Sequence, residues 1–305
     1  MLRKNSKRNL RIAAGLASVC AALFVICFAN GIFGERAKRV FSPVGFNSDF
    51  DKSQDFVEIM DVGQGDSILV YSNGCSALID AGLTTFADDI AENLRKYNIS
   101  DIDVALVTHL HMDHAGGLKN IAEIFDIDNL VIPADDEDAE AQDLVNDVKE
   151  ITDSRKGKIY TAVQGMNFKI GEFTLTVLCC YGDMKNENSR SAVVMAEIDG
   201  LKFLFTGDAE SDTEKALLNE GINVDCDVLK VGHHGSKTSS LKEFIEASSP
   251  TYAAISVGFD NTYSHPSGSV LDELKSENAR VYRTDRNGDI IFFAENGKIR
   301  VKTEK

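Results

Sequence analysis

Three imidazoles and one carboxylate lie within six residues of this chain, in the pattern His109-x-His111-x-Asp113-His114. Imidazole and carboxylate are ligands that zinc, iron and manganese take in proteins. We expect His109 and His111 to point to one side of the bending chain, and Asp113 and His114 to fold beneath them. Two such ligand pairs around a common centre would hold two ions ~3.5–4 Å apart, an arrangement that activates water. The spacing therefore predicts a metal centre and not a loop of solvated histidines.

The chain has six histidines, and all of them lie in short motifs. The other three are His233 and His234, in the sequence Lys-Val-Gly-His-His-Gly-Ser, and His265, in the sequence Tyr-Ser-His-Pro. The chain has no histidine outside these motifs, and such clustering is typical of a metal site.

Short apolar runs precede these polar residues and predict the buried strands that position them. Residues 104–107 lead into the histidine motif, residues 76–79 end at Asp80, and residues 202–205 end before Asp208. Asp80 is expected to hold a ligand histidine by its second ring nitrogen, with a solvated turn as the alternative. A carboxylate at the end of a buried run needs a cation beside it. Asp208 is therefore expected to bridge two ions rather than to cap the helix that begins near Ser211.

The turn Asp61-Val-Gly-Gln-Gly-Asp66 joins two further predicted strands, residues 56–60 and 67–71. Its glycines allow a tight loop. Such a loop would bring Asp61 and Asp66 together, where they would support the metal ligands or contact substrate. A plain hairpin turn is the alternative.

The rest of the pattern alternates strands with helices in two blocks. Acidic residues 135–138 indicate a solvated helix start, with a second cation site as the alternative. These elements predict one α/β domain, residues 55–305, with two sheets packed face to face and helices outside. The predicted helices are 86–97, 118–125, 211–219, 241–247 and 269–277, and an antiparallel meander is predicted from runs 158–163, 168–170, 173–178, 192–198 and 202–205.

The N-terminal segment differs sharply in charge from the rest of the chain. Residues 1–39 hold eight Lys or Arg and one acid, so residues 40–305 keep 24 basic and 47 acidic side chains, a formal charge of −23. The uncharged run 12–33 is long enough to span the ~30 Å hydrocarbon layer as one helix, and its basic flank should stay inside. Residues 1–33 are thus predicted to anchor an external domain through the linker 34–54. A cleaved signal segment, with a small-x-small site at 27–29, is the alternative and would make the protein secreted.

Four cysteines lie outside that segment, at Cys75, Cys179, Cys180 and Cys226. Their apolar surroundings fit small buried residues as well as extracellular disulfides. Cys179 and Cys180 would face opposite ways on a strand and are not expected to bond each other.

The histidine motif after a strand, Leu-Ile-Asp80-Ala-Gly before it and Thr-Gly-Asp208 after it resemble the metallo-β-lactamase superfamily. More narrowly, residues 61–67, 206–208, 229–236 and 256–266 resemble the extracellular hydrolase domain of competence DNA-internalisation (ComEC-type) proteins. The resemblance covers roughly residues 55–303 and implies a four-layer αβ/βα sandwich with metals at the sheet edges. The large multi-helix membrane domain of those proteins has no counterpart in this sequence, so a DNA channel is not expected.

The resemblance also implies a ligand set for two divalent ions, zinc first and manganese as the alternative. His109 and His111 would bind one ion, Asp113 and His114 the other, and Asp208 would lie between them. The last ligand of the second ion would be His234, with His265 as the close alternative. The superfamily's third histidine for the first ion is missing, because residues 188–191 are Asn-Ser-Arg-Ser, so the first site is expected to be weak.

These features predict an extracytoplasmic hydrolase in which a metal-activated water attacks a phosphodiester or related ester. Lys-rich patches are scarce outside Lys230 and Lys237, and the acidic charge favours a small phosphate ester over nucleic acid. The alternatives are a nuclease associated with DNA uptake, a β-lactam or thioester hydrolase, and a metal-stabilised cell-surface binding module without catalysis. The expected catalytic residues are Asp113, Asp208 and His233, and the expected substrate contacts are Asn188, Ser236 and Lys237.

Overall fold

The computed structural model describes residues 51–133, 139–182, 184 and 186–305. They belong to a compact unit that spans Phe46–Lys305. The predicted anchor at 1–33, most of the predicted linker and the acidic run 135–138 lie outside the described residues. Within the described residues, no helix is both long and apolar enough to cross a membrane.

Two mixed sheets form the centre of the molecule. Sheet A has eight strands in the order β15-β14-β1-β2-β3-β4-β5-β6, and sheet B has seven in the order β13-β12-β11-β10-β9-β8-β7. The strands of sheet A are β1 (Asp55–Ile59), β2 (Ile68–Ser72), β3 (Cys75–Ile79), β4 (Asp101–Leu106), β5 (Asp126–Ile132), β6 (Lys158–Thr161), β14 (Ile290–Glu295) and β15 (Lys298–Thr303). Those of sheet B are β7 (Asn167–Ile170), β8 (Phe173–Cys179), β9 (Val193–Ile198), β10 (Leu201–Phe205), β11 (Val228–Lys230), β12 (Tyr252–Ile255) and β13 (Arg280–Arg283).

Each sheet contains a run of four parallel strands joined through helices. In sheet A these strands are β3 to β6, and in sheet B they are β10 to β13. The carboxyl ends of parallel strands meet at one edge, which is where α/β proteins place their ligands. The segments after β3, β4, β10 and β11 therefore gather the polar motifs.

The predicted five-stranded meander is wrong in one strand. Residues 158–161 form β6, which pairs parallel with β5 in sheet A, so the meander in sheet B has four strands, β7 to β10. The sequence between β5 and β6 explains the difference, because it forms helix α6 (Ala139–Ser154) and crosses back over sheet A.

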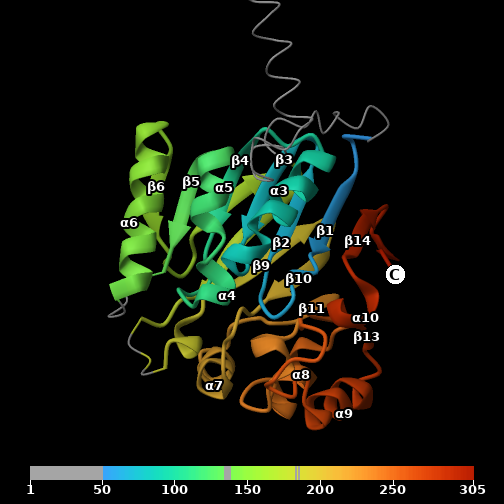
Figure 1. The fold of residues 1–305 in the computed structure, drawn as a ribbon. Coiled ribbons are helices and arrows are strands. Elements are labelled where there is room, and N and C mark those ends of the chain that lie inside the picture. The colour runs from blue at the N-terminus through green and yellow to red at the C-terminus, as the bar shows by residue number, and fades with distance from the viewer. Residues whose placement is uncertain (1–50, 134–138, 183, 185) are drawn as a thin grey trace, which may run out of the picture. The chain divides into compact units, whose positions relative to one another are not determined.

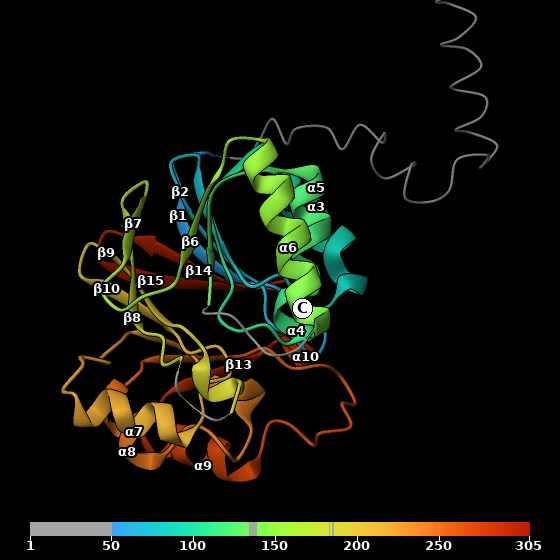
Figure 2. The ribbon, with the colours of Figure 1, turned by 90° about the vertical axis from the view of Figure 1, so that its left-hand side faces the viewer.

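The helices cover the outer faces of both sheets. Figures 1 and 2 show α3, α5 and α6 over sheet A and α7, α8 and α9 over sheet B. The helices in chain order are α3 (Ala87–Lys96), α4 (Met112–Ala115), α5 (Leu118–Ile124), α6, α7 (Ser211–Asn219), α8 (Lys242–Ser248), α9 (Gly268–Ser276) and α10 (Thr284–Asn287). The expected two sheets with helices outside are thus confirmed.

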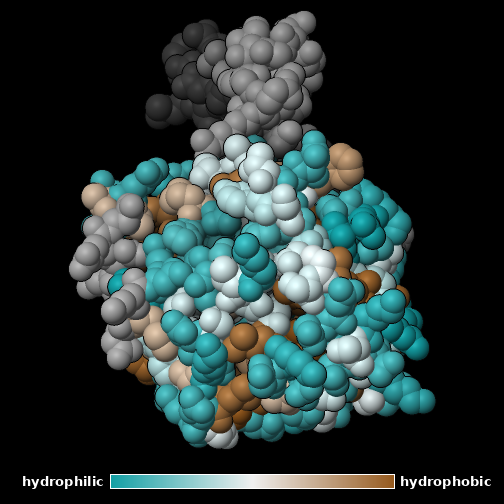
Figure 3. Space-filling model, turned by 90° about the horizontal axis from the view of Figure 1, so that it is seen from below, coloured by the Kyte–Doolittle hydropathy of each residue, from teal (hydrophilic) through white to brown (hydrophobic). Residues whose placement is uncertain are grey.

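Alternation along the strands supplies the cores between these layers. Val57 and Ile59 of β1 point between the sheets, whereas Phe56 packs toward the helices of sheet A. Likewise Phe203 and Phe205 of β10 enter the central core, while Leu204 packs toward the helices of sheet B. The face seen in Figure 3 is mainly hydrophilic and carries small apolar clusters. Of the cysteines that the structure describes, Cys75, Cys179 and Cys226 are free thiols, and Cys179 and Cys226 are buried.

Candidate metal centre

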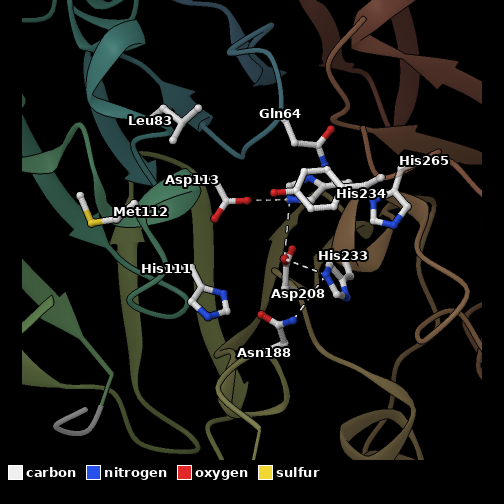
Figure 4. A pocket seen from close by; sticks show the side chains of 11 residues that line it. Gln64, Leu83, His111, Met112, Asp113, Asn188, Asp208, His233, His234 and His265 are labelled. Atoms are coloured by element: carbon white, nitrogen blue, oxygen red, sulfur yellow. Dashed lines mark hydrogen bonds and ion pairs between the residues drawn. The ribbon is translucent and has the colours of Figure 1, made fainter. Parts of the chain in front are cut away.

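Four side chains from both sheets converge between the sheet edges. Asp113 and His114 lie in α4, just after β4, while Asp208 follows β10 and His234 follows β11 in the short helix η3 (Gly232–Gly235). Each offers a ligand atom, and these atoms all lie within 4.8 Å of one another. His114 Nε2 is 3.2 Å from Asp208 Oδ1, and His234 Nε2 is 3.3 Å from Asp113 Oδ2 (Figure 4 shows Asp113, Asp208 and His234).

This cluster has the properties of a site for a divalent ion. Among the described residues, His114 Nε2, Asp208 Oδ1 and His234 Nε2 are buried and have no hydrogen-bond partner beyond the ion-pair contacts that they make with one another and with Asp113. Buried polar atoms in proteins normally have one, so these three atoms are left for a ligand in the space between them. Two carboxylates also balance the charge of a divalent ion when both imidazoles are neutral. The donor set of two imidazoles and two carboxylates suits zinc, manganese or iron.

The electrostatics of the cluster favour positive charge. Burial acts to lower the pKa of His114, but the carboxylates of Asp208 and Asp80 raise it well above its usual value. Burial acts to raise the pKa of Asp208, but His234 and His114 hold it well below its usual value. Burial also acts to raise the pKa of Asp113, but His234 and His114 lower it to about 2. The carboxylates thus stay ionised and attract a cation.

Asp80 orients the first of the two histidines. It follows β3 with φ +60°, a backbone conformation that is uncommon for a non-glycine residue and often marks a functional site. Its Oδ2 lies 2.8 Å from His114 Nδ1, and it accepts hydrogen bonds from the backbone and hydroxyl of Thr108 at 2.8 and 2.7 Å. A carboxylate on the second ring nitrogen turns the free Nε2 toward the cluster. Asp80 therefore lies where the sequence suggested, against a histidine of the site.

The His233-His234 pair has an unusual backbone. Both residues have positive φ, +48° and +53°, and the next residue, Gly235, packs so closely on Pro266 that a Cβ would lie 2.6 Å from it. His234 Nδ1 lies 3.0 Å from the carbonyl of Ser256, which leaves Nε2 for the cluster. His233 points the other way, with Nδ1 3.1 Å from Thr238 Oγ1 and Nε2 3.7 Å from Asp208 Oδ2.

His109 and His111 form a separate pair. His109 Nε2 lies 3.1 Å from His111 Nδ1, and His111 Nε2 lies 3.0 Å from Glu187 Oε2. Neither histidine joins a metal-binding group among the described residues. Glu187, which the sequence reasoning missed, precedes the segment where the expected third histidine is absent. The neighbouring Asn188 lies near His233, with Nδ2 3.4 Å from its Nε2. The arrangement with two ions stays a prediction.

Three predicted site residues lie away from the cluster. Asp61 Oδ2 is 3.2 Å from Lys305 Nζ, whereas Asp66 Oδ2 is 2.7 Å from Lys230 Nζ, so the two acids pair with different lysines and do not meet as expected. Ser236 is buried and its hydroxyl lies 3.0 Å from Thr238 Oγ1. Lys237 is exposed and does not line the cavity.

A cavity of about 590 Å³ opens over the cluster, a volume typical of small-molecule sites. His265 lies in its wall and not in the ligand group, so of the two candidates for the last ligand it is His234 that the structure brings to the cluster. The lining residues are Gln64, Leu83, His111, Met112, Asp113, Asn188, Asp208, His233, His234, Tyr263 and His265.

The layered αβ/βα architecture defines an α/β protein with a candidate metal site between two sheet edges. The chain belongs to the metallo-beta-lactamase superfamily, whose family model matches residues 60–258. It is 31% identical over 80% of its length to ComE operon protein 3 of Bacillus subtilis (strain 168), and 28% identical over 93% to competence protein ComA of Neisseria gonorrhoeae.

The matches cover only 34% and 39% of those two relatives, so the chain spans little more than a third of their length. Among solved structures it is similar to CmlA, a diiron beta-hydroxylase from Streptomyces venezuelae, with a TM-score of 0.51 and 16% identity. That match covers 76% of this chain and 53% of CmlA, and it concerns the fold alone.

Proposed function

We propose that the protein is a metal-dependent phosphodiesterase that acts on a small phosphate ester. The observation that supports this function best is the buried group Asp113, His114, Asp208 and His234 beside an open cavity of about 590 Å³. A divalent ion bound there supplies a water of lowered pKa and a positive charge for the phosphoryl oxygens.

The side chains around the cluster have distinct tasks in this proposal. His234 and His114 are held by their Nδ1 atoms and so keep a fixed orientation. The side chain of Asp113 is 30% exposed, and it can accept a hydrogen bond from the attacking water and so orient it. His233 Nε2 lies 3.7 Å from Asp208 Oδ2 (Figure 4) and can donate a proton to the departing alkoxide. Asn188 Nδ2 can donate to a phosphoryl oxygen.

The test is turnover of bis(p-nitrophenyl) phosphate by the purified full-length chain, with zinc and manganese compared. We expect metal-dependent release of nitrophenol that a chelator abolishes. His233→Gln should lower kcat while leaving the bound metal unchanged, because it removes the proton donor and no ligand of the four-residue group. If the protein binds metal but does not hydrolyse this ester, the result would favour a metal-stabilised binding module without catalysis. If it hydrolyses only a β-lactam or a thioester, the result would favour a hydrolase of that class.

A nuclease is the second candidate. Similarity to proteins named for competence favours it, but the charge of −23 on residues 40–305 opposes the binding of a polyanion. A single-stranded oligonucleotide offered in the same assay separates the two candidates, since the small-ester proposal expects much slower cleavage of the oligonucleotide.

We also propose that the domain lies outside the cytoplasm and is attached to the membrane through residues 1–33. The basic flank before residues 12–33 supports this orientation. Protease added to intact cells should then digest the domain, and full protection would contradict the proposal.

A further inference from the structure

Asp66 and Lys230 form an ion pair that lies wholly inside the protein. Lys230 Nζ is 2.7 Å from Asp66 Oδ2, and both side chains have no exposed surface. In the sequence, Lys230 and Lys237 are exceptions to a general scarcity of basic patches, as if both side chains were at the surface. The structure corrects this, because β11 is buried on both sides and turns Lys230 inward toward the loop after β1.

This ion pair connects the two sheets directly behind the metal centre. Asp66 belongs to the loop between β1 and β2 of sheet A, whereas Lys230 ends β11 of sheet B. The backbone N–H of Asp66 donates to the carbonyl of Asp113 at 3.1 Å. The loop lies so close to Asp113 that a Cβ on Gly65 would be 2.4 Å from that carbonyl oxygen. The turn that carries Asp66 is therefore packed against one ligand of the cluster.

The carboxylate of Asp66 also faces a second ligand. Its Oδ1 lies 3.5 Å from His234 Nδ1, on the ring edge opposite the nitrogen that enters the cluster. Asp80 has the corresponding place behind His114, at 2.8 Å from its Nδ1. Each histidine of the cluster thus has a carboxylate behind it, one from each of two loops in sheet A.

Stability alone gives no reason for such a pair. An apolar pair of similar volume is often as stable as a buried ion pair or more so, because both charges lose their hydration. Asp66 also lies near Asp80 and His114, with ligand atoms within 4.8 Å, so two carboxylates share one buried region. The two carboxylates repel each other, and a buried cation beside them offsets this repulsion. Lys230 is that cation, because it forms an ion pair with Asp66.

We propose that Asp66 and Lys230 are a positioning pair for the metal centre. Asp66 acts with the Ser256 carbonyl, which lies 3.0 Å from His234 Nδ1, to orient His234 so that Nε2 faces Asp113 and Asp208. Lys230 neutralises Asp66 and holds its carboxylate in place. The proposal goes beyond the phosphodiesterase function and concerns the affinity and geometry of the bound ion, whatever reaction follows.

The experiment compares Asp66→Asn, Lys230→Met and the double variant in the full-length chain. Thermal unfolding is measured without metal, zinc affinity by competition with a chromophoric chelator, and geometry by the visible absorption of bound cobalt. Each single variant should unfold at a lower temperature, because it leaves one buried partner unmatched. The double variant should recover most of that loss, yet bind zinc about 10–100-fold more weakly and show an altered cobalt spectrum.

The double variant decides the question, because it removes both charges and is expected to fold even where a single variant does not. If it recovers wild-type stability and also wild-type zinc affinity and cobalt spectrum, the pair is only a structural brace and the proposal is wrong. Lys202→Met is the matched control, since it breaks an ion pair of sheet B with Asp225 at the surface, 3.0 Å long, and should change neither metal readout. No readout depends on ester hydrolysis, so a failure here is distinct from a failure of the proposed function.

Discussion

Removal of the charge of Asp208 tests the metal centre most directly. The substitution Asp208→Asn keeps the size of a side chain that is almost fully buried and contacts His114 at 3.2 Å and His234 at 3.6 Å. The backbone N–H of Asp208 donates to Ser191 Oγ at 3.1 Å, and this bond does not involve the side chain. The variant is therefore expected to fold.

The expected loss of affinity follows from the geometry. The ligand atoms lie within 4.8 Å of one another, so an ion among them is within about 4 Å of the Asp208 carboxylate. At that distance a carboxylate and a divalent ion attract by about 8 kcal/mol at an effective dielectric constant near 20. Since about 1.4 kcal/mol is a tenfold change, the full loss would be about 10⁵–10⁶-fold. The amide oxygen of Asn remains a neutral ligand and water screens the site, and both effects offset much of this loss, so we expect zinc affinity to fall by at least about 10²–10³-fold.

Zinc affinity is measured by chelator competition, and hydrolysis is measured as turnover of bis(p-nitrophenyl) phosphate. Circular dichroism checks that the variant is folded. We expect a folded variant with weak metal binding and little hydrolysis at micromolar zinc. A variant that kept both wild-type metal affinity and wild-type turnover would refute the assignment of Asp208 as a metal ligand and, with it, the site described above.

Three further predictions concern other parts of the domain. Asp113→Ala should lose more bound metal by native mass spectrometry than Asn188→Ala, because only Asp113 brings a charge, and equal metal content in wild type and Asp113→Ala would contradict this. Tyr263→Leu should raise KM for bis(p-nitrophenyl) phosphate by about 2–10-fold with little change in kcat or melting temperature, because the 66% exposed ring lines the cavity and can pack on an aryl group. Burial raises the pKa of Glu58 to about 7 from 4.5, so wild-type stability falls as pH rises between these values and the penalty is complete above pH 7. Glu58→Gln should therefore raise the free energy of unfolding by up to about 3 kcal/mol at pH 8 but not at pH 4, as urea unfolding can measure, with exposed Glu197→Gln as the control.

The parts of the site that lie at strand ends could be predicted from the sequence. Buried strands have short apolar runs, and the residue that follows such a run lies at a sheet edge. This rule places Asp80 and the histidine motif at one edge of sheet A, and Asp208 and His234 at one edge of sheet B. Because β3 and β4 are parallel, as are β10 and β11, the residues that follow these strands gather at the same edge of their sheet. Local pattern was sufficient there because the strand and the functional residue are adjacent in the chain.

Features that depend on distant partners could not be predicted in the same way. Residues 158–161 have the pattern of a strand but nothing that selects β5 over β7 as neighbour. Lys230 looks like any surface lysine until Asp66, which is 164 positions away, is seen to face it. Asp61 and Asp66 are close in sequence, yet the turn between them directs one toward Lys305 and the other into the interior. In each case the deciding contact is made by a residue far along the chain.

The charge around the cavity connects metal binding with substrate choice. None of the described residues that line the cavity is a lysine or an arginine, although the cavity contains Asp113 and Asp208. In the proposed function, the positive charge that this part of the site offers an anionic ester comes from a bound ion, and the imidazoles of the lining act as hydrogen-bond donors. That charge is confined to one place, and the surrounding domain is strongly acidic. A single phosphate can reach it, whereas the further phosphates of a polymer would lie beside a domain whose net charge is strongly negative. We infer that binding of substrate requires the ion as much as catalysis does, and that the smallest diesters are bound best.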